Sequence, residues 1–163
     1  MNFGDELEVR PAIIRDLDSV ADVWHESASQ MDGASTEMPS RDELRQRIDQ
    51  ELATGWELHV ATSGGIIIGM LALKPATATL DQLFVRPAEQ GRGVGRALLD
   101  FAKRILPRFT LRTATSNTQG RRLYEREGLS LTKEGAHPRT GAPVCYYEWR
   151  PSKGMNESIF QRI

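Results

Sequence analysis

The sequence predicts one α/β domain built around a mixed β-sheet, and three observations lead to this prediction. Apolar residues alternate with period 2 in some segments and recur with period 3.6 in others, which gives the order β-α-α-β-β-β-α-β-α-β-β. Strands and helices interleave without a long linker, a low-complexity segment or an internal repeat. The 163 residues are enough for one hydrophobic core of ordinary size.

The first half of the chain shows clear start and stop signals. Asp16 precedes a helical stripe of apolar residues, and Ser40 with Glu43 forms a capping box at the start of a second helix. Gly64-Gly65 lies between two apolar runs, which is typical of a hairpin. The predicted elements are, in order, a strand over 6–11, helices over 17–28 and 40–54, and strands over 56–62 and 66–74.

The second half of the chain carries similar stop signals. Pro107 stops one helix, and Gly128 has the position of a helix C′ residue in another. The predicted elements are a strand over 77–86, a helix over 94–105, a strand over 109–114, a helix over 121–127, and strands over 129–133 and 144–149. Residues 30–39 are expected to form a loop, and the tail from residue 151 has no assigned structure.

Composition excludes several classes of protein. With 39% hydrophobic and 26% charged residues the chain is globular rather than disordered, and its net charge of -1 provides no basic field for nucleic acid or membrane binding. The longest apolar run, 66–73, is too short for a membrane span, and the first residues do not resemble a signal peptide. Cys145 is the single cysteine, so no internal disulfide forms. We therefore expect a cytoplasmic protein.

The most informative segment is a glycine-spaced turn between a strand and a helix. Gly91, Gly93 and Gly95 let a ligand approach the main chain, and the N–H groups at a helix N-terminus favour a phosphate. A P-loop is excluded because no Gly-Lys-Ser/Thr follows. A dinucleotide fingerprint is excluded because Arg96 occupies the position of its last glycine. The turn predicts a phosphate site of another kind.

Two motifs identify a family resemblance. The run from Gln90 to Gly95, after Leu-Phe-Val-x-Pro, resembles the pyrophosphate-binding signature of the GNAT superfamily of acetyl-CoA-dependent N-acetyltransferases. Asn117, followed seven positions later by Tyr124 in Leu-Tyr-Glu-x-x-Gly, is similar to the second motif of that family. Gly120 stands where alanine is usual, and Leu129 stands where phenylalanine is usual.

The resemblance has implications for both fold and reaction. It implies a GNAT-like domain over 1–150, with a splay between the two middle strands and about four flanking helices, and a tail over 151–163 of unknown role. The implied reaction moves an acetyl group from acetyl-CoA to a primary amine by direct attack in a ternary complex, without a metal. The implied cofactor-binding residues are Leu83, Phe84, Val85, Gln90, Gly91, Arg92, Gly93, Val94, Gly95, Arg96 and Asn117.

Each part of the cofactor has an expected partner in this set. The amides of 91–96 hold the pyrophosphate, with added charge from the Arg92 and Arg96 side chains. The pantetheine arm pairs with the main chain of 83–85, whose N–H groups polarise the thioester, and Asn117 holds the arm from the next strand.

Two residues are expected to carry the proton transfers. The resemblance makes Tyr124 the general acid that protonates the CoA thiolate as it leaves. Asp81 is the first candidate for the base, because the resemblance places an acidic residue of some aminoglycoside-type relatives four positions before Val85. Strand alternation also puts Asp81 on one face with Leu83 and Val85. His25 and Glu26 are lesser candidates for the same role.

The acceptor stays open at this stage. Relatives that acetylate ribosomal-protein termini carry a glutamate where this chain has Arg112, which counts against that substrate class. Residues 30–39 and 133–143 are the expected sources of specificity. Two alternatives stand beside the small-molecule enzyme: a non-catalytic module that senses acyl-CoA, and an acetyltransferase directed at proteins or peptides. A homodimer that uses the final strand is a further possibility.

Overall fold

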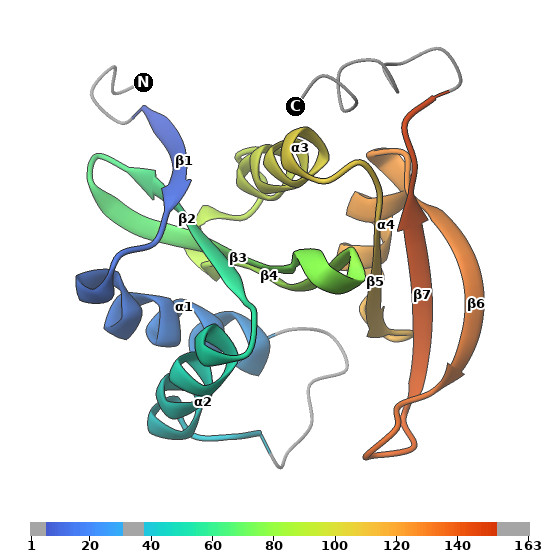
Figure 1. The fold of residues 1–163 in the computed structure, drawn as a ribbon, viewed down its shortest axis with the longest axis horizontal. Helices are drawn as coiled ribbons and strands as arrows, with labels where there is room; N and C mark the ends of the chain where they lie inside the picture. Colours follow the sequence, from blue (N-terminus) through green and yellow to red (C-terminus); the bar gives the residue numbers. More distant parts are fainter. Residues whose placement is uncertain (1–5, 31–37, 153–163) are drawn as a thin grey trace.

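The strands form one seven-stranded mixed sheet in the order β1-β2-β3-β4-β5-β7-β6 (Figure 1). The computed structural model describes residues 6–30 and 38–152. The strands are β1 (Leu7–Pro11), β2 (Glu57–Ser63), β3 (Ile66–Lys74), β4 (Thr79–Val85), β5 (Phe109–Ala114), β6 (Ser130–Ala136) and β7 (Pro143–Trp149). The α-helices are α1 (Leu17–Ser29), α2 (Arg41–Ala53), α3 (Val94–Ile105) and α4 (Thr118–Arg126).

Helices cover the sheet on both faces, and the alternation of β3 shows how the core divides. Met70 packs with α1 and α2 on one face, whereas its neighbour Leu71 packs with α3 and α4 on the other. Figure 1 shows α1 and α2 below the sheet and α3 above it. The predicted α/β class, element order and number of helices are therefore confirmed. Within the described residues, no helix combines the length and the apolar character that crossing a bilayer requires.

The sheet opens between its two middle strands. β4 and β5 are parallel and share the single register pair Thr79–Thr110, whereas β5 and β7 pair over six residues. Beyond that pair the strands diverge, and in Figure 1 β5, β7 and β6 turn away from the other four. The predicted splay is confirmed, and it leaves the far end of β4 without a neighbouring strand on one side.

Several boundaries differ from the predicted ones for local reasons. β4 begins at Thr79 because Pro75–Thr77 forms a short 3-10 turn that ends at Ala78 with φ +49°. α4 begins at Thr118, earlier than predicted, because the Asn117 side chain caps it. β7 lies between β5 and β6, so its backbone is paired on both sides and has no free edge for a second subunit. Most of the predicted loop 30–39 and of the tail lies outside the described residues.

His59 on β2 is a buried histidine without hydrogen-bond partners in the described part of the chain. Its ring lies 4.6 Å from that of Phe101 on α3, measured between centroids, and both ring nitrogens are buried and unpaired. Burial lowers the pKa of His59 below the model value of 6.5, against an opposing effect of Glu57. Folding thus favours the neutral form of this imidazole.

We expect His59→Leu to raise the free energy of unfolding by about 1 kcal/mol at neutral pH, because it removes two unpaired buried nitrogens. The gain should grow on acidification. The unfolded chain binds a proton as the pH falls through about 6.5 whereas the folded chain does so only at lower pH, so wild-type stability decreases there. Urea unfolding at about pH 8 and about pH 5 measures both effects.

His59→Gln is the control: it keeps a polar group but cannot titrate, so its difference from the leucine variant should not change with pH. A wild-type-to-leucine gap that is equal at both pH values would contradict the assignment.

Candidate active site

A cavity of about 620 Å³ lies at the opening of the sheet. β4, the glycine turn, α3 and α4 form most of its wall, and α1 contributes Ser27 and Gln30. Of the residues singled out from the sequence, the cavity wall contains Leu83, Phe84, Val85, Gln90, Gly91, Gly93, Val94, Gly95, Arg96, Asn117 and Tyr124. Arg92 and Asp81 do not line it. The two sequence motifs therefore meet at one site.

The glycine turn exposes main-chain N–H groups to the cavity. Gly91 and Gly93 have φ angles of +81° and +85°, which are accessible to glycine at little cost. Gly93 is the N-cap of α3 and no side chain caps the helix; the bond from the Ala97 N–H to the Gly93 carbonyl closes the first turn. The N–H groups of 94–96 thus have no intrahelical partner. No heavy atom lies within 4 Å of a Cβ built on Gly91 or Gly93, so the approach is open.

β4 offers a free backbone edge beside this turn. The Arg86 N–H donates to the Ile68 carbonyl at 2.8 Å, which makes these two residues a hydrogen-bonded pair of the antiparallel ladder. Because such pairs alternate along a ladder, the N–H and C=O groups of Leu83 and Val85 point away from β3 and toward β5. β5 has diverged at this level, so these groups face the opening.

One of these backbone groups is already used. The Ser27 hydroxyl of α1 donates to the Val85 carbonyl at 2.9 Å, and Gln90 Nε2 donates to the same oxygen at 3.3 Å. Ser27 is buried, so this contact fixes the end of α1 against the end of β4. The Val85 N–H and both groups of Leu83 stay directed at the cavity. Ser27 was not identified from the sequence, because nothing in the helical periodicity of α1 distinguishes it.

Tyr124 on α4 is buried, with 7% of its surface exposed, and it borders the cavity. Its ring centroid lies 5.8 Å from that of Tyr147. Burial, with a smaller effect of Tyr147, raises the pKa of Tyr124 to about 12. No hydrogen bond engages its hydroxyl within residues 6–30 and 38–152. The phenol thus keeps its proton at physiological pH and can donate it to a group in the cavity.

Asn117 joins the second motif to β5. Its Oδ1 accepts from the Gly120 N–H at 3.2 Å, and its Nδ2 donates to Thr113 Oγ1 at 2.9 Å. An amide NH2 carries two hydrogens, so one remains for a ligand. A Cβ on Gly120 would lie 2.3 Å from Asn117 Nδ2. This close approach explains why glycine replaces the usual alanine at position 120.

The positive charges around the cavity differ from those expected. Arg92 pairs with Glu89 and lies outside the lining, whereas Arg96 lines the cavity near Glu127, at 3.7 Å. Arg122 and Arg126 of α4 also line it and were missed in the sequence. The sequence could have indicated these two arginines, because positions 119, 122 and 126 fall on one face of a helix that begins after Asn117.

The expectation that Asp81, Leu83 and Val85 share one face is wrong. The β3–β4 register shifts between Ala72 and Leu73, so Asp81 is an extra residue in its strand. Leu80 and Leu83 consequently pack into the same core cluster.

Asp81 itself is held away from the cavity. The Trp56 indole N–H donates to Asp81 Oδ2 at 2.8 Å, and Lys74 Nζ lies 3.9 Å from the same oxygen. Glu26 pairs with Arg86 at 2.6 Å, and neither Glu26 nor His25 lines the cavity. The structure thus brings none of the three candidate bases to the site.

Comparison with known proteins shows which family this chain resembles. The model of the acetyltransferase (GNAT) domain matches residues 24–141. A mycothiol acetyltransferase from Beutenbergia cavernae is 35% identical over 95 residues, which are 54% of this chain and 31% of that protein. The chain thus spans about a third of the length of that curated relative.

Solved structures share the fold at low sequence identity. A GCN5-related N-acetyltransferase from Rhodopseudomonas palustris has a TM-score of 0.72 at 17% identity, over 93% of this chain and 99% of that one. The acetyltransferase yncA from Salmonella typhimurium, solved with its cofactor acetyl-CoA, has a TM-score of 0.64 at 16% identity, over 88% and 93%. Since the family model covers more than half of the sequence, the chain belongs to the GNAT acetyltransferase family.

Proposed function

We propose that the protein transfers the acetyl group of acetyl-CoA to a primary amine by direct attack in a ternary complex. The observation that carries the proposal is the convergence, on one cavity, of the uncapped α3 N-terminus, the free edge of β4 and the Tyr124 hydroxyl. The first suits a diphosphate, the second an extended chain with amides, and the third a leaving group that gains negative charge.

The wall of the cavity fits acetyl-CoA part by part. The N–H groups of 94–96 would hold the diphosphate, and Arg96, Arg122 and Arg126 would add positive charge. The backbone groups of Leu83 and the N–H of Val85 would pair with the amides of the pantetheine arm, with the second hydrogen of Asn117 Nδ2 opposite. Bound there, acetyl-CoA supplies the activated acetyl thioester.

The chain contributes to the chemistry mainly by donating hydrogen bonds. As the amine nitrogen forms its bond to the carbonyl carbon, a β4 N–H would stabilise the oxyanion, and Tyr124 would protonate the sulfur as the C–S bond breaks. Glu89 is the one carboxylate in the cavity wall of the described residues, and it is paired with Arg92. We therefore assign the acceptance of the amine proton to water.

Direct attack also agrees with the position of Cys145. The thiol is fully buried in the core and lies 3.3 Å from the Thr115 hydroxyl, away from the cavity wall. No acetyl-cysteine intermediate forms there. Initial rates at varied amine and acetyl-CoA should therefore give intersecting rather than parallel double-reciprocal lines.

The test is release of free CoA thiol from acetyl-CoA over a panel of primary amines, with acetyl-CoA binding measured separately by calorimetry. Thiol release that depends on the amine, with an acetylated product of the expected mass, supports the proposal. Tight binding without thiol release from any amine or peptide would instead favour a module that senses acyl-CoA. Release with peptides alone would assign the enzyme to the protein-directed class.

A further inference from the structure

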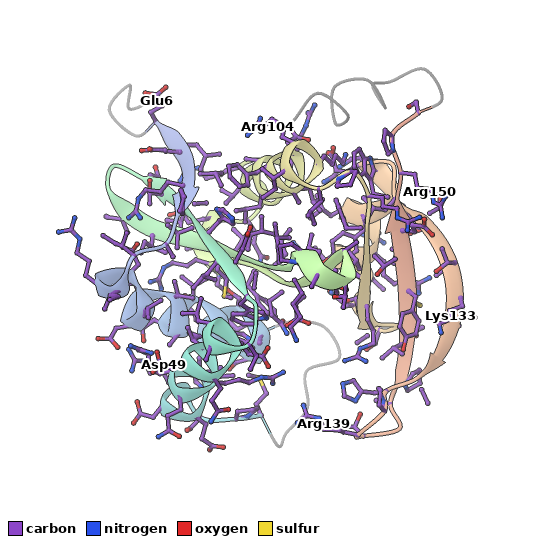
Figure 2. All side chains as sticks on the ribbon, in the orientation of Figure 1. Glu6, Asp49, Arg104, Lys133, Arg139 and Arg150 are labelled. Carbon is purple, nitrogen blue, oxygen red and sulfur yellow. The ribbon has the colours of Figure 1, made fainter. Side chains whose placement is uncertain are left out.

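A second group of polar residues lies on the face of β5, β7 and β6 that no described helix covers. In β5, Phe109 and Leu111 point into the core beneath α3, so Arg112, which follows Leu111 directly, points to the opposite face. That is the face on which α1 and α2 cover the other half of the sheet. Figure 2 shows Arg139 at the end of the β6–β7 hairpin, on the side nearer to α2 in this view.

His137 in this hairpin has a defined protonation pattern. Its Nδ1 accepts from the backbone N–H of Arg139 at 3.1 Å and of Thr140 at 3.4 Å. Nδ1 therefore carries no hydrogen, and the hydrogen of the neutral ring is on Nε2. Burial lowers the pKa of His137, and the charges of Arg112, Arg139 and Arg47 lower it further, so the ring is neutral at physiological pH.

The contact between His137 and Arg112 thus joins two donors. Arg112 Nη2 lies 3.4 Å from His137 Nε2. A guanidinium has no acceptor, and Nε2 carries a hydrogen, so neither atom satisfies the other. Two N–H groups held this close are arranged for an acceptor that both can reach, such as one oxygen of a carboxylate or phosphate.

The charges around this pair are also unbalanced. Within the described residues, no carboxylate lies within 4.0 Å of the Arg112 or Arg139 side chain. The charge of Arg47 on α2 also acts on this histidine, since it contributes to the lowered pKa of the ring. The Arg47 guanidinium lies 5.5 Å from the ring of Trp24, which stacks on Phe84 at 6.4 Å, and Phe84 lines the acetyl-CoA cavity. Arg47 thus acts electrostatically on His137 and is linked to the cavity wall through the rings of Trp24 and Phe84.

We propose that the acceptor amine also carries an anionic group, a carboxylate or a phosphate, which binds between Arg112 Nη2 and His137 Nε2. The proposal rests on the proposed function and names the class of its acceptor. Arg47 and Arg139 provide further attraction, and the same charges repel polycationic amines. An Arg112 guanidinium also suits the fork of a carboxylate better than a lysine would.

The test compares matched amines that differ only in charge. Amino acids are assayed by thiol release beside their amides and methyl esters, and aminoalkyl phosphates beside the parent amino alcohols. The acids or phosphates should exceed their neutral partners at least tenfold in kcat/KM, and the better of the two pairs identifies the anion. Equal rates for charged and neutral partners, or a preference for diamines, would overturn the acceptor class while leaving the proposed function intact.

Variants separate anion recognition from other effects. Arg112→Ala should raise KM for the anionic amine at least tenfold, reduce the preference over the amide to within about twofold, and leave the KM for acetyl-CoA unchanged. Arg108→Ala is the control. Arg108 is another exposed arginine near β5, and it lies outside both the cavity wall and the group around His137, so its loss should change none of these values. A preference that survives in Arg112→Ala would contradict the proposal. Absence of thiol release from every amine would refute the proposed function and the acceptor class together.

Discussion

Tyr124→Phe is expected to lower kcat by about 10²- to 10⁴-fold, the usual contribution of a positioned proton donor, while the Kd for acetyl-CoA changes by less than about twofold. In the proposed reaction the sulfur of CoA gains negative charge as the C–S bond breaks, and the phenol of Tyr124, which lines the cavity, would donate a proton to it. With its pKa raised to about 12, Tyr124 is protonated over the whole working pH range. The alkaline limb of the pH–rate profile should accordingly lie well above neutrality. Assays of thiol release measure kcat, and calorimetry measures the Kd for acetyl-CoA.

Tyr147→Phe is the matched control for this variant. Tyr147 is fully buried beside Tyr124, and its hydroxyl accepts from Arg121 Nε at 3.0 Å, so its loss alters packing and hydrogen bonding without removing a group from the cavity wall. We expect lower stability but a kcat within about threefold of the wild type. A Tyr124→Phe variant with undiminished kcat would remove Tyr124 from the mechanism.

Gly93→Ala is expected to weaken acetyl-CoA binding at least tenfold, which corresponds to about 1.4 kcal/mol. The new methyl group would occupy the open space through which a diphosphate reaches the N–H groups of α3. In addition, φ of +85° at this position costs an alanine about 1–2 kcal/mol, so the turn is driven toward another conformation. Calorimetric titration with acetyl-CoA measures the loss, and the ligand-induced rise in Tm should shrink in parallel.

Gly65→Ala provides the comparison for backbone strain alone. Gly65 has φ of +80° in the β2–β3 turn, with no heavy atom within 4 Å of its built Cβ, and it lies outside the cavity wall. Both variants should lose a similar amount of intrinsic stability, and only Gly93→Ala should lose affinity. Wild-type affinity in Gly93→Ala would show that the α3 N-terminus does not hold the diphosphate.

The extent to which the sequence predicts the site depends on how local each signal is. The glycine turn and the start of α3 are short-range features, and their residues converge on the cavity as the motif spacing suggests. The start of α4 is placed too late from the sequence, because Gly120 is a poor helix former unless the Asn117 cap is known. The helix, the turn and the order of elements along the chain follow from local signals, and these parts of the fold are confirmed.

Contacts that depend on the register between strands cannot be predicted from the sequence alone. The interpretation of Asp81 assumes an unbroken strand, and the shift beside Leu73 moves it to the indole of Trp56. The contact between Arg112 and His137 joins a residue of β5 to one 25 positions later in the β6–β7 hairpin, so no periodicity reveals it. Specificity determined by such contacts becomes visible only when the register of β5, β6 and β7 is known.

A sheet whose two halves share one residue pair has a mechanical consequence. The other neighbouring strands are joined by ladders of at least five residue pairs, whereas along this seam cohesion depends on side chains such as Gln90, which reaches Gln119 on α4 at 3.1 Å. A molecule of acetyl-CoA bound between β4 and β5 would take the place of a strand and hold the two halves of the sheet together. The resistance of the protein to proteolysis inside a cell would then rise and fall with the supply of its own acetyl donor.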